Sequence, residues 1–268
     1  MEKIIALIVL IIVAYLGFGL YLYVFQEHFV FPGAFVKTPT YPKPAWMEEI
    51  NVKTRDDKFL VVWANKDFDP KKPTCVYFHG NFENISSRID LYERLLPTCN
   101  ILAPSYRGYY GPSYKPSVAN LYNDTDDFLT YFKKNVKTWV VIGYSLGGAP
   151  ATYFASRQHV SRLILYSTFV DLRTVVSNHL IYRFFLPFLK FDLPNIHYLS
   201  NVKAEKVAIV HGGDDLVVSP KNFEIFRKTF NVYTNFNFYF YESADHGNII
   251  EISWQDISMF LSSVPLSS

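Results

Sequence analysis

The sequence predicts an α/β fold, in which a mostly parallel β-sheet has helices on both faces and is preceded by a single apolar helix. From about residue 48 onward, short apolar runs alternate with longer amphipathic stretches, as repeated strand–helix–strand units require. Several of the middle runs are continuous in Val, Ile and Leu, which is typical of parallel strands buried on both faces. The chain has 268 residues and can bury such a core without disulfides or metals.

The first predicted element is an apolar run of about 22 residues over 4–25, with no charge between Lys3 and Glu27. A helix of this length crosses a ~30 Å hydrocarbon layer, and tyrosines toward one end resemble an interfacial aromatic belt. We therefore predict an uncleaved transmembrane signal-anchor over residues 1–27. A cleaved signal peptide and a buried core helix are the alternatives. The positive charge before the run favours a location of the following domain on the extracytoplasmic side.

After this run, four prolines in residues 28–47 predict an extended linker, and a single folded domain is expected over 48–265. Strands are predicted at 49–53, 59–64, 75–78, 100–104, 139–142, 163–166, 207–210 and 236–241. Helices are predicted near 83–96, 118–134, 146–157, 220–230 and 248–261. The Phe-rich stretch at about 169–200 is too long for an ordinary connection. It predicts either a core-packed helix pair or a short helical cap over the carboxyl edge of the sheet.

Composition excludes several classes of function. Lys and Arg number 26 against 24 Asp and Glu, so a nearly neutral chain without a basic block is not expected to bind nucleic acid. Two cysteines cannot form a disulfide scaffold or, alone, a four-ligand zinc site. No metal-binding or nucleotide-binding motif is present, and we expect neither a cofactor nor a metal.

The sharpest motif is GYSLG at 143–147, directly after an apolar strand and before an amphipathic helix. A serine on so tight a turn needs small residues two positions away on each side, and the turn projects its hydroxyl from the edge of the sheet. Ser145 is therefore the predicted nucleophile.

A serine nucleophile needs a base and an acid, and on such a sheet both follow later strands in chain order. His246 follows the last predicted strand and is the expected base; Asp215 follows the preceding strand and is the expected acid. Asp214 is the neighbouring alternative to Asp215. Asp245 adjoins His246 and is poorly placed to reach its far ring nitrogen. The histidines that end earlier strands, His79 and His211, are expected to brace loops.

An oxyanion that develops at the substrate carbonyl needs two backbone donors. The amide of Leu146, after the nucleophile, is the first. The second is expected from the loop HGNFEN at 79–84, where the amide of Asn81 is favoured and that of Phe82 is the alternative.

With these residues in place, the chain resembles the alpha/beta-hydrolase superfamily, and more narrowly its membrane-anchored abhydrolase-domain proteins. That group includes serine esterases, lysophospholipases and protein depalmitoylases. The resemblance covers roughly 48–263 and the apolar segment, and rests on YFHGNFEN at 77–84, SYRGYYGPSYKPS at 105–117, IGYSLGGAPA at 142–151, HGGDDLVVSP at 211–220 and ADHGN at 244–248. It implies an eight-stranded, mostly parallel sheet, the Ser145–Asp215–His246 triad, and oxyanion donors at Asn81 and Leu146. Arg107 and Gly108 would form a structural turn, and Tyr110 departs from the usual pattern.

These predictions combine into a membrane-anchored serine hydrolase that cleaves esters or thioesters of an apolar acyl group. Its partners would be a small-molecule or lipid substrate and the bilayer. A peptidase or amidase on the same triad and a silent binding module are the alternatives. Cys75 and Cys99 precede strands that are expected to be neighbours, a separation that allows a disulfide in an oxidising compartment. Two free buried thiols are the favoured state, and the disulfide is the alternative.

Overall fold

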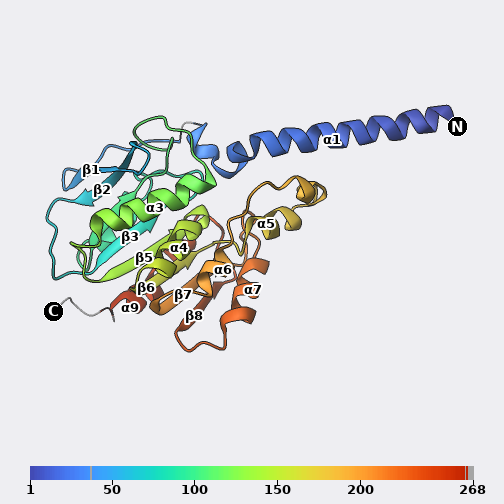
Figure 1. The fold of residues 1–268 in the computed structure, drawn as a ribbon. Helices are drawn as coiled ribbons and strands as arrows, with labels where there is room; N and C mark the ends of the chain where they lie inside the picture. The colour runs from blue at the N-terminus through green and yellow to red at the C-terminus, as the bar shows by residue number, and fades with distance from the viewer. Residues whose placement is uncertain (37, 263, 265–268) are drawn as a thin grey trace.

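A computed structural model of the protein describes residues 1–36, 38–262 and 264. The chain forms one eight-stranded sheet in the order β1-β2-β4-β3-β5-β6-β7-β8, from which a long helix extends (Figure 1). The predicted α/β-hydrolase fold, with a mostly parallel sheet, is confirmed. The predicted domain end, residue 265, lies outside the described residues, as does residue 37 of the predicted linker.

In the order of the sheet, the first two strand pairs are antiparallel, and every later pair is parallel. β1 pairs with β2 and β2 with β4 in antiparallel fashion, whereas β3 pairs with both β4 and β5 in parallel. The parallel strands therefore end at one edge of the sheet, where their loops gather. The strands are β1 (Met47–Lys53), β2 (Phe59–Asn65), β3 (Thr74–Phe78), β4 (Asn100–Pro104), β5 (Trp139–Tyr144), β6 (Val160–Tyr166), β7 (Ala204–Gly212) and β8 (Phe236–Tyr241).

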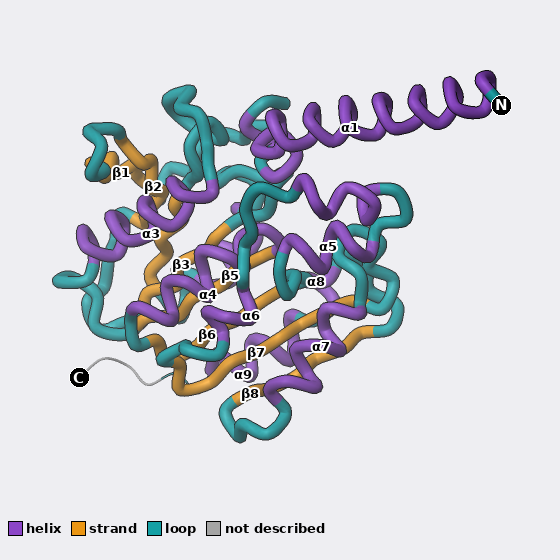
Figure 2. Tube along the Cα trace, turned by 45° about the vertical axis from the view of Figure 1, so that its right-hand side comes forward, coloured by secondary structure: helices purple, strands orange, loops and turns teal. Residues whose placement is uncertain are grey.

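Helices cover both faces of the sheet (Figure 2). On one face α3 (Val118–Phe132), α4 (Gly148–Arg157) and α7 (Lys221–Phe230) contribute Phe128, Phe154 and Phe226 to one buried cluster. The other face is covered by α2 (Ile89–Leu95), α8 (Ile249–Ile252) and α9 (Trp254–Ser262), whose apolar side chains form a second cluster. The two hydrophobic layers explain why the central strands are apolar throughout.

Two of the predicted helices differ most from the structure. The helix expected from residue 83 begins at Ile89, because the Asn84 carboxamide oxygen accepts hydrogen bonds from the amide and hydroxyl of Ser86 and holds this segment in a turn. The helix expected over 248–261 is divided into α8 and α9 at Ser253, whose hydroxyl donates to the carbonyl of Ile249.

The Phe-rich stretch forms a cap with a buried base and an exposed middle. It contains α5 (Leu172–Asn178), the 3-10 helix η3 (Tyr182–Phe188) and α6 (Asn195–Leu199). Leu193 and Leu199 are buried in the core, whereas no residue of η3 is buried. Of the two predicted forms, the structure therefore has the cap rather than the core-packed pair.

The long helix α1 (Glu2–Val30) is the one described helix with the length and hydropathy to cross a membrane. The proline-containing segment after it is docked on the domain. The Phe31 side chain is buried in the core, and the Gly33 amide donates to the carbonyl of Asn81 at 3.1 Å. The Asn84 carboxamide, also buried, donates to Thr38 and to the carbonyl of Pro39. The predicted linker is thus part of the folded domain.

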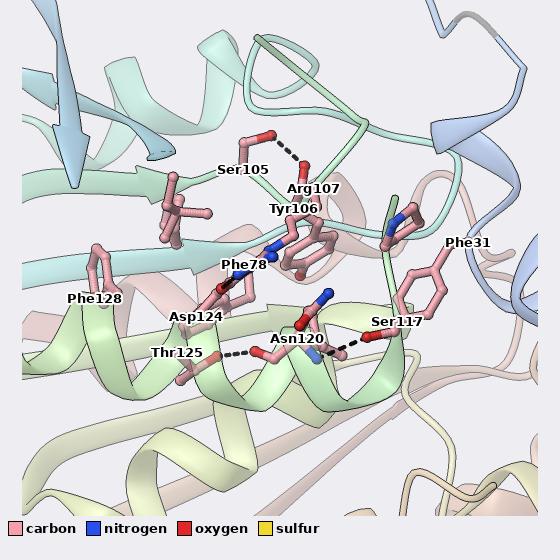
Figure 3. Close-up of a pocket in the computed structure, with 14 residues that line it drawn as sticks. Phe31, Phe78, Ser105, Tyr106, Arg107, Ser117, Asn120, Asp124, Thr125 and Phe128 are labelled. Atoms are coloured by element: carbon pink, nitrogen blue, oxygen red, sulfur yellow. Dashed lines mark hydrogen bonds and ion pairs between the residues drawn. The ribbon is translucent and has the colours of Figure 1, made fainter. Parts of the chain in front are cut away.

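A small cavity near this segment is lined by residues that hold parts of the fold together (Figure 3). It has a volume of about 20 Å³, which has room for about one water molecule. Along its wall Arg107 donates to both carboxylate oxygens of Asp124, at 2.8 and 2.6 Å. Arg107 also pairs with Asp56, and Gly108 follows with a φ of 80°, which only glycine adopts readily. Arg107 therefore fastens the loop after β4 to α3.

Cys75 of β3 and Cys99, which precedes β4, are joined by a disulfide, with their Cα atoms 5.8 Å apart. Because β3 and β4 are parallel neighbours with Cys75 opposite Ile101, the chain passes close to Cys75 again at Cys99. The favoured prediction of two free thiols is therefore wrong, and the structure has the bridge.

Candidate active site

Ser145 lies on a strained turn between β5 and α4. Its φ is 54°, in the left-handed region that a non-glycine residue occupies at a cost. A Cβ atom at Gly143 would lie 2.6 Å from the carbonyl oxygen of Gly147, and one at Gly147 would overlap the carbonyl oxygen of Phe78. The glycines of the motif are therefore required by the close approach of β3, β5 and α4 at this turn.

The strained turn is held by a residue that follows the next strand, β6. The Thr168 hydroxyl, after β6, donates to the carbonyl of Ser145 at 2.9 Å. The buried Asn195 carboxamide donates to the carbonyl of Phe169 at 2.8 Å and approaches the Thr168 oxygen at 3.3 Å. Backbone strain at a functional residue persists when its surroundings fix it, and these contacts supply that constraint.

Asp215 and His246 form the central polar contact of the site. A carboxylate oxygen of Asp215, Oδ2, lies 2.8 Å from Nδ1 of His246. The other oxygen, Oδ1, accepts hydrogen bonds from the amides of Val217 and Val218 at 2.9 and 2.8 Å. Burial raises the pKa of Asp215, but the hydrogen bond and charge of His246 and the Val218 amide outweigh burial and lower the pKa below its ordinary value. Asp215 is therefore held as a carboxylate that orients the imidazole.

The rival acids have other positions. The Asp214 side chain is exposed. Asp245 accepts hydrogen bonds from the amides of Gly247 and Asn248, so it closes the turn beside His246. His211 lies with Nε2 2.9 Å from the carbonyl of Val218, and thus braces the loop that carries Asp215.

Tyr144, the residue before the candidate nucleophile, connects His246 to the serine turn. Its hydroxyl donates to the carbonyl of His246 at 2.6 Å, and the two rings lie 5.1 Å apart. The guanidinium of Arg88 lies over the ring of Tyr144 at 4.9 Å. The structure therefore brings the turns that carry Ser145 and His246 together through one side chain.

The loop after β3 is positioned by a half-buried ion pair that sequence reasoning missed. Glu83 pairs with Arg88, with 2.6 Å between its oxygen Oε1 and the guanidinium Nε. Its second oxygen, Oε2, accepts hydrogen bonds from the Gly80 amide and the Tyr77 hydroxyl, both at 3.1 Å. One sequence signal could have indicated this ion pair: a Glu and an Arg lie five residues apart, beside a strand that is predicted to be buried.

Contacts to the carbonyl oxygens of Gly80 and Asn81 fix the orientation of two peptide planes in this loop. The carbonyl oxygen of Gly80 lies 2.8 Å from Nδ1 of His79 and accepts a hydrogen bond from the Glu83 amide. Because C=O and N–H point in opposite directions across a trans peptide, these contacts set the direction of the Asn81 N–H. The carbonyl of Asn81 accepts hydrogen bonds from Gly33 and the Tyr109 hydroxyl, which likewise sets the direction of the Phe82 N–H.

His79 is fully buried, and burial lowers its pKa to about 4, against the opposing effect of the Gly80 hydrogen bond. The unfolded ring takes up a proton near pH 6.5, whereas the folded ring stays neutral until about pH 4. The free energy of unfolding is therefore expected to fall by about 2 kcal/mol from pH 7.5 to pH 5 through this group. Urea unfolding should show that His79→Asn loses this part of the pH dependence. Equal pH dependence in variant and wild type would contradict the assignment.

A cavity of about 410 Å³ opens beside the serine turn, within the size range of small-molecule sites. Asn81, Ser145 and Leu146 all line it, so the structure brings the candidate nucleophile and both candidate oxyanion residues to one space. His246 is not among the lining residues and is connected to the site through Asp215 and Tyr144. The rest of the wall is mainly apolar and includes Phe169, Val175 and Phe188.

Within the described ranges, no group of three or more His, Cys, Asp and Glu side chains is arranged to hold a metal ion.

Comparison with known proteins supports the fold. Residues 73–196, which include β3, Ser145 and α4, match the family model of the alpha/beta hydrolase fold. The chain is 32% identical over 177 residues to the protein Bem46 of Schizosaccharomyces pombe. That match covers 58% of this chain and 58% of Bem46, so the chain spans less than two thirds of its relative's length.

Solved structures share the fold over most of the chain. The Pyrococcus furiosus esterase Pf2001 superposes with a TM-score of 0.67 at 18% identity and covers 85% of this chain and 96% of its own. The acetyl xylan esterase from Paenibacillus sp. R4 superposes with a TM-score of 0.63 at 14% identity, over 84% of this chain and 86% of its own. Together with the sheet order and the serine turn, these matches show that the chain has the alpha/beta hydrolase fold.

Proposed function

We propose that the protein is a membrane-anchored serine hydrolase that cleaves carboxylic esters or thioesters of an apolar acyl group. The observation that carries the proposal is the strained Ser145 turn, which lines an apolar cavity beside the His246–Asp215 pair. A left-handed serine between two obligatory glycines is costly for a turn with no chemical role. The esterase structures with the same fold support the choice of ester chemistry.

In the proposed reaction, the Ser145 oxygen attacks the carbonyl carbon while Nε2 of His246 takes the hydroxyl proton. The carbonyl electrons move to the oxygen, which the amides of Asn81 and Leu146 stabilise. Collapse of this intermediate breaks the bond to the alcohol or thiol, which leaves with the proton from His246. Water then attacks the acyl-serine by the same path, and the carboxylic acid leaves with Ser145 restored.

Membrane anchoring is proposed from α1. Its most apolar 18-residue window has a mean hydropathy of 2.7 and is 6% buried, which does not fit a buried core helix. The Cys75–Cys99 disulfide favours an oxidising compartment. This agrees with the extracytoplasmic location of the domain, which the charges beside the apolar run favour.

A series of p-nitrophenyl esters tests the acyl preference. The purified full-length protein is expected to show a kcat/KM at least about tenfold higher for octanoate than for acetate. Six further methylene groups at up to ~0.8 kcal/mol each can supply more than the 1.4 kcal/mol this requires. Peptidyl p-nitroanilides serve as the comparison for the peptidase alternative. Cleavage of anilides but not esters would contradict the proposal, and absence of both cleavage and fluorophosphonate labelling would favour a silent binding module.

A further inference from the structure

The cavity beside Ser145 is walled in part by the apolar helix. Four residues of α1 line it together with the cap and the serine turn: Leu22, Gln26, Phe29 and Val30. The apolar helix therefore contributes to the space next to the candidate nucleophile, in addition to any role as a tether.

Polar contacts fasten α1 to the cap. The Gln26 carboxamide donates to the carbonyl of Phe188 at 3.1 Å, and its oxygen accepts from the amides of Lys190 and Phe191 at 2.9 and 3.3 Å. Near the middle of the helix, the Tyr15 hydroxyl donates to the carbonyl of Phe184 at 2.9 Å. A buried glutamine that satisfies three backbone groups of another segment fixes the two segments in register.

Ring packing follows the same face of the helix. The rings of Tyr15 and Phe185 stack with centroids 5.2 Å apart, and those of Phe18 and Phe185 meet edge to face at 4.9 Å. At Gly19 a Cβ atom would overlap the ring of Phe188, so the glycine permits close packing against η3. The cap therefore contacts α1 from Tyr15 to Gln26, and both views show it beside the helix (Figures 1 and 2).

This contact overlaps the apolar run over 4–25. Residues 15–25 account for about half of that run, roughly 16 Å at 1.5 Å per residue, and a hydrocarbon layer is ~30 Å thick. If α1 crosses a bilayer while it keeps these contacts, the cap edge must lie at the depth of one leaflet.

The cap edge has the surface that such a position requires. Leu180, Ile181 and Phe184 are 71%, 59% and 59% exposed, a local concentration of large apolar side chains that water does not favour. The nearby Arg183 guanidinium lies over the ring of Phe184 at 5.0 Å, and such long cationic side chains extend to the polar boundary of a bilayer.

We propose that the cap edge at residues 180–184 is embedded in the same leaflet as the second half of α1, and that the cavity receives its acyl chain laterally from that leaflet, between α1 and η3. The ligand class is a long-chain acyl ester or thioester whose chain is dissolved in the bilayer. This inference rests on the proposed function and specifies how the substrate reaches Ser145.

The first test places a larger side chain at the proposed entrance between α1 and η3. Full-length protein in phosphatidylcholine vesicles is assayed with a fluorogenic palmitoyl ester in the bilayer and with soluble p-nitrophenyl acetate. Leu22→Trp, in the cavity wall, is expected to lower the palmitate-to-acetate ratio of kcat/KM about tenfold. Leu20→Trp is the matched control, because Leu20 is 60% exposed on the same helix.

Equal ratios in the two variants, with acetate still hydrolysed, would overturn lateral entry but leave the proposed function intact. If the wild-type protein hydrolysed neither the palmitoyl ester nor p-nitrophenyl acetate, that result would instead contradict the proposed function. The acyl chain could come from a lipid ester or from the thioester of an acylated protein. A lysophospholipid and a transmembrane peptide that carries a palmitoyl thioester, each in the same vesicles, distinguish these two sources. Cleavage of neither, while acetate is turned over, would also overturn the proposal.

The second test measures depth without catalysis. The two native cysteines are joined in a disulfide, so Phe184→Cys and Tyr131→Cys each offer one thiol for an environment-sensitive fluorophore. Tyr131 is 50% exposed on α3, away from the cap, and serves as the control. We expect lipid-chain spin labels to quench the probe at 184, and aqueous iodide to quench the probe at 131. Iodide quenching of both probes to the same extent would overturn the embedded position of the cap.

Discussion

Ser145→Ala is expected to lower kcat for octanoate hydrolysis by roughly 10⁶-fold, the scale at which loss of the nucleophile disables a serine hydrolase. Alanine keeps the small volume at the turn but has no hydroxyl to form the acyl-serine. The measurement is p-nitrophenyl octanoate turnover by the full-length variant, with fluorophosphonate labelling of the same sample.

A matched control shows whether lost turnover is due to the missing Ser145 hydroxyl or to the preparation of a variant protein. Ser258 is half-buried on α9, with its hydroxyl directed to the carbonyl of Gln255, and Ser258→Ala is expected to keep wild-type turnover. If Ser145→Ala retained most of the wild-type rate, Ser145 would not be the nucleophile.

Asp215→Asn is expected to lower kcat about 10⁴-fold without a large loss of stability. The amides of Val217 and Val218 both donate to Oδ1, so the asparagine oxygen must occupy that position and its NH₂ group must face Nδ1 of His246. His246 would then accept at Nδ1 and carry its proton at Nε2, the wrong tautomer to receive a proton from Ser145.

The adjacent Asp214→Asn removes the same charge from the same loop and is expected to retain activity, because the Asp214 side chain is exposed. Thermal unfolding of both variants should show similar midpoints. A fully active Asp215→Asn together with an inactive Asp214→Asn would reverse the assignment of the acid.

The sheet and the candidate triad could be predicted because their signals are local. A strand that is apolar at every position, a glycine on each side of Ser145, and an acid or histidine just after a late strand each occupy fewer than ten residues. The parallel topology then brings the carboxyl ends of these strands to one edge. The direction of the Asp215 carboxylate toward His246 and the exposure of Asp214 required the structure.

Contacts between distant segments could not be predicted from a single sequence. Tyr144 and His246 are 102 residues apart, and Gln26 and Phe188 are 162 apart, so no periodicity or motif relates them. The tyrosine in GYSLG carried no local signal of its hydrogen bond to the His246 carbonyl. Likewise the prolines after α1 predicted an extended linker, whereas α1 continues to Val30 and residues 32–34 form a 3-10 helix. The contact between Gly33 and Asn81 depends on the loop after β3, which the composition of this segment does not reveal.

Mass-spectrometric mapping of a fluorophosphonate adduct tests the central claim most directly. The full-length protein is labelled with and without excess octanoyl ester, digested and sequenced by fragmentation. The proposed mechanism predicts a single adduct on Ser145 that the ester suppresses. An adduct on another residue, or ester turnover in protein whose Ser145 remains unlabelled, would contradict it.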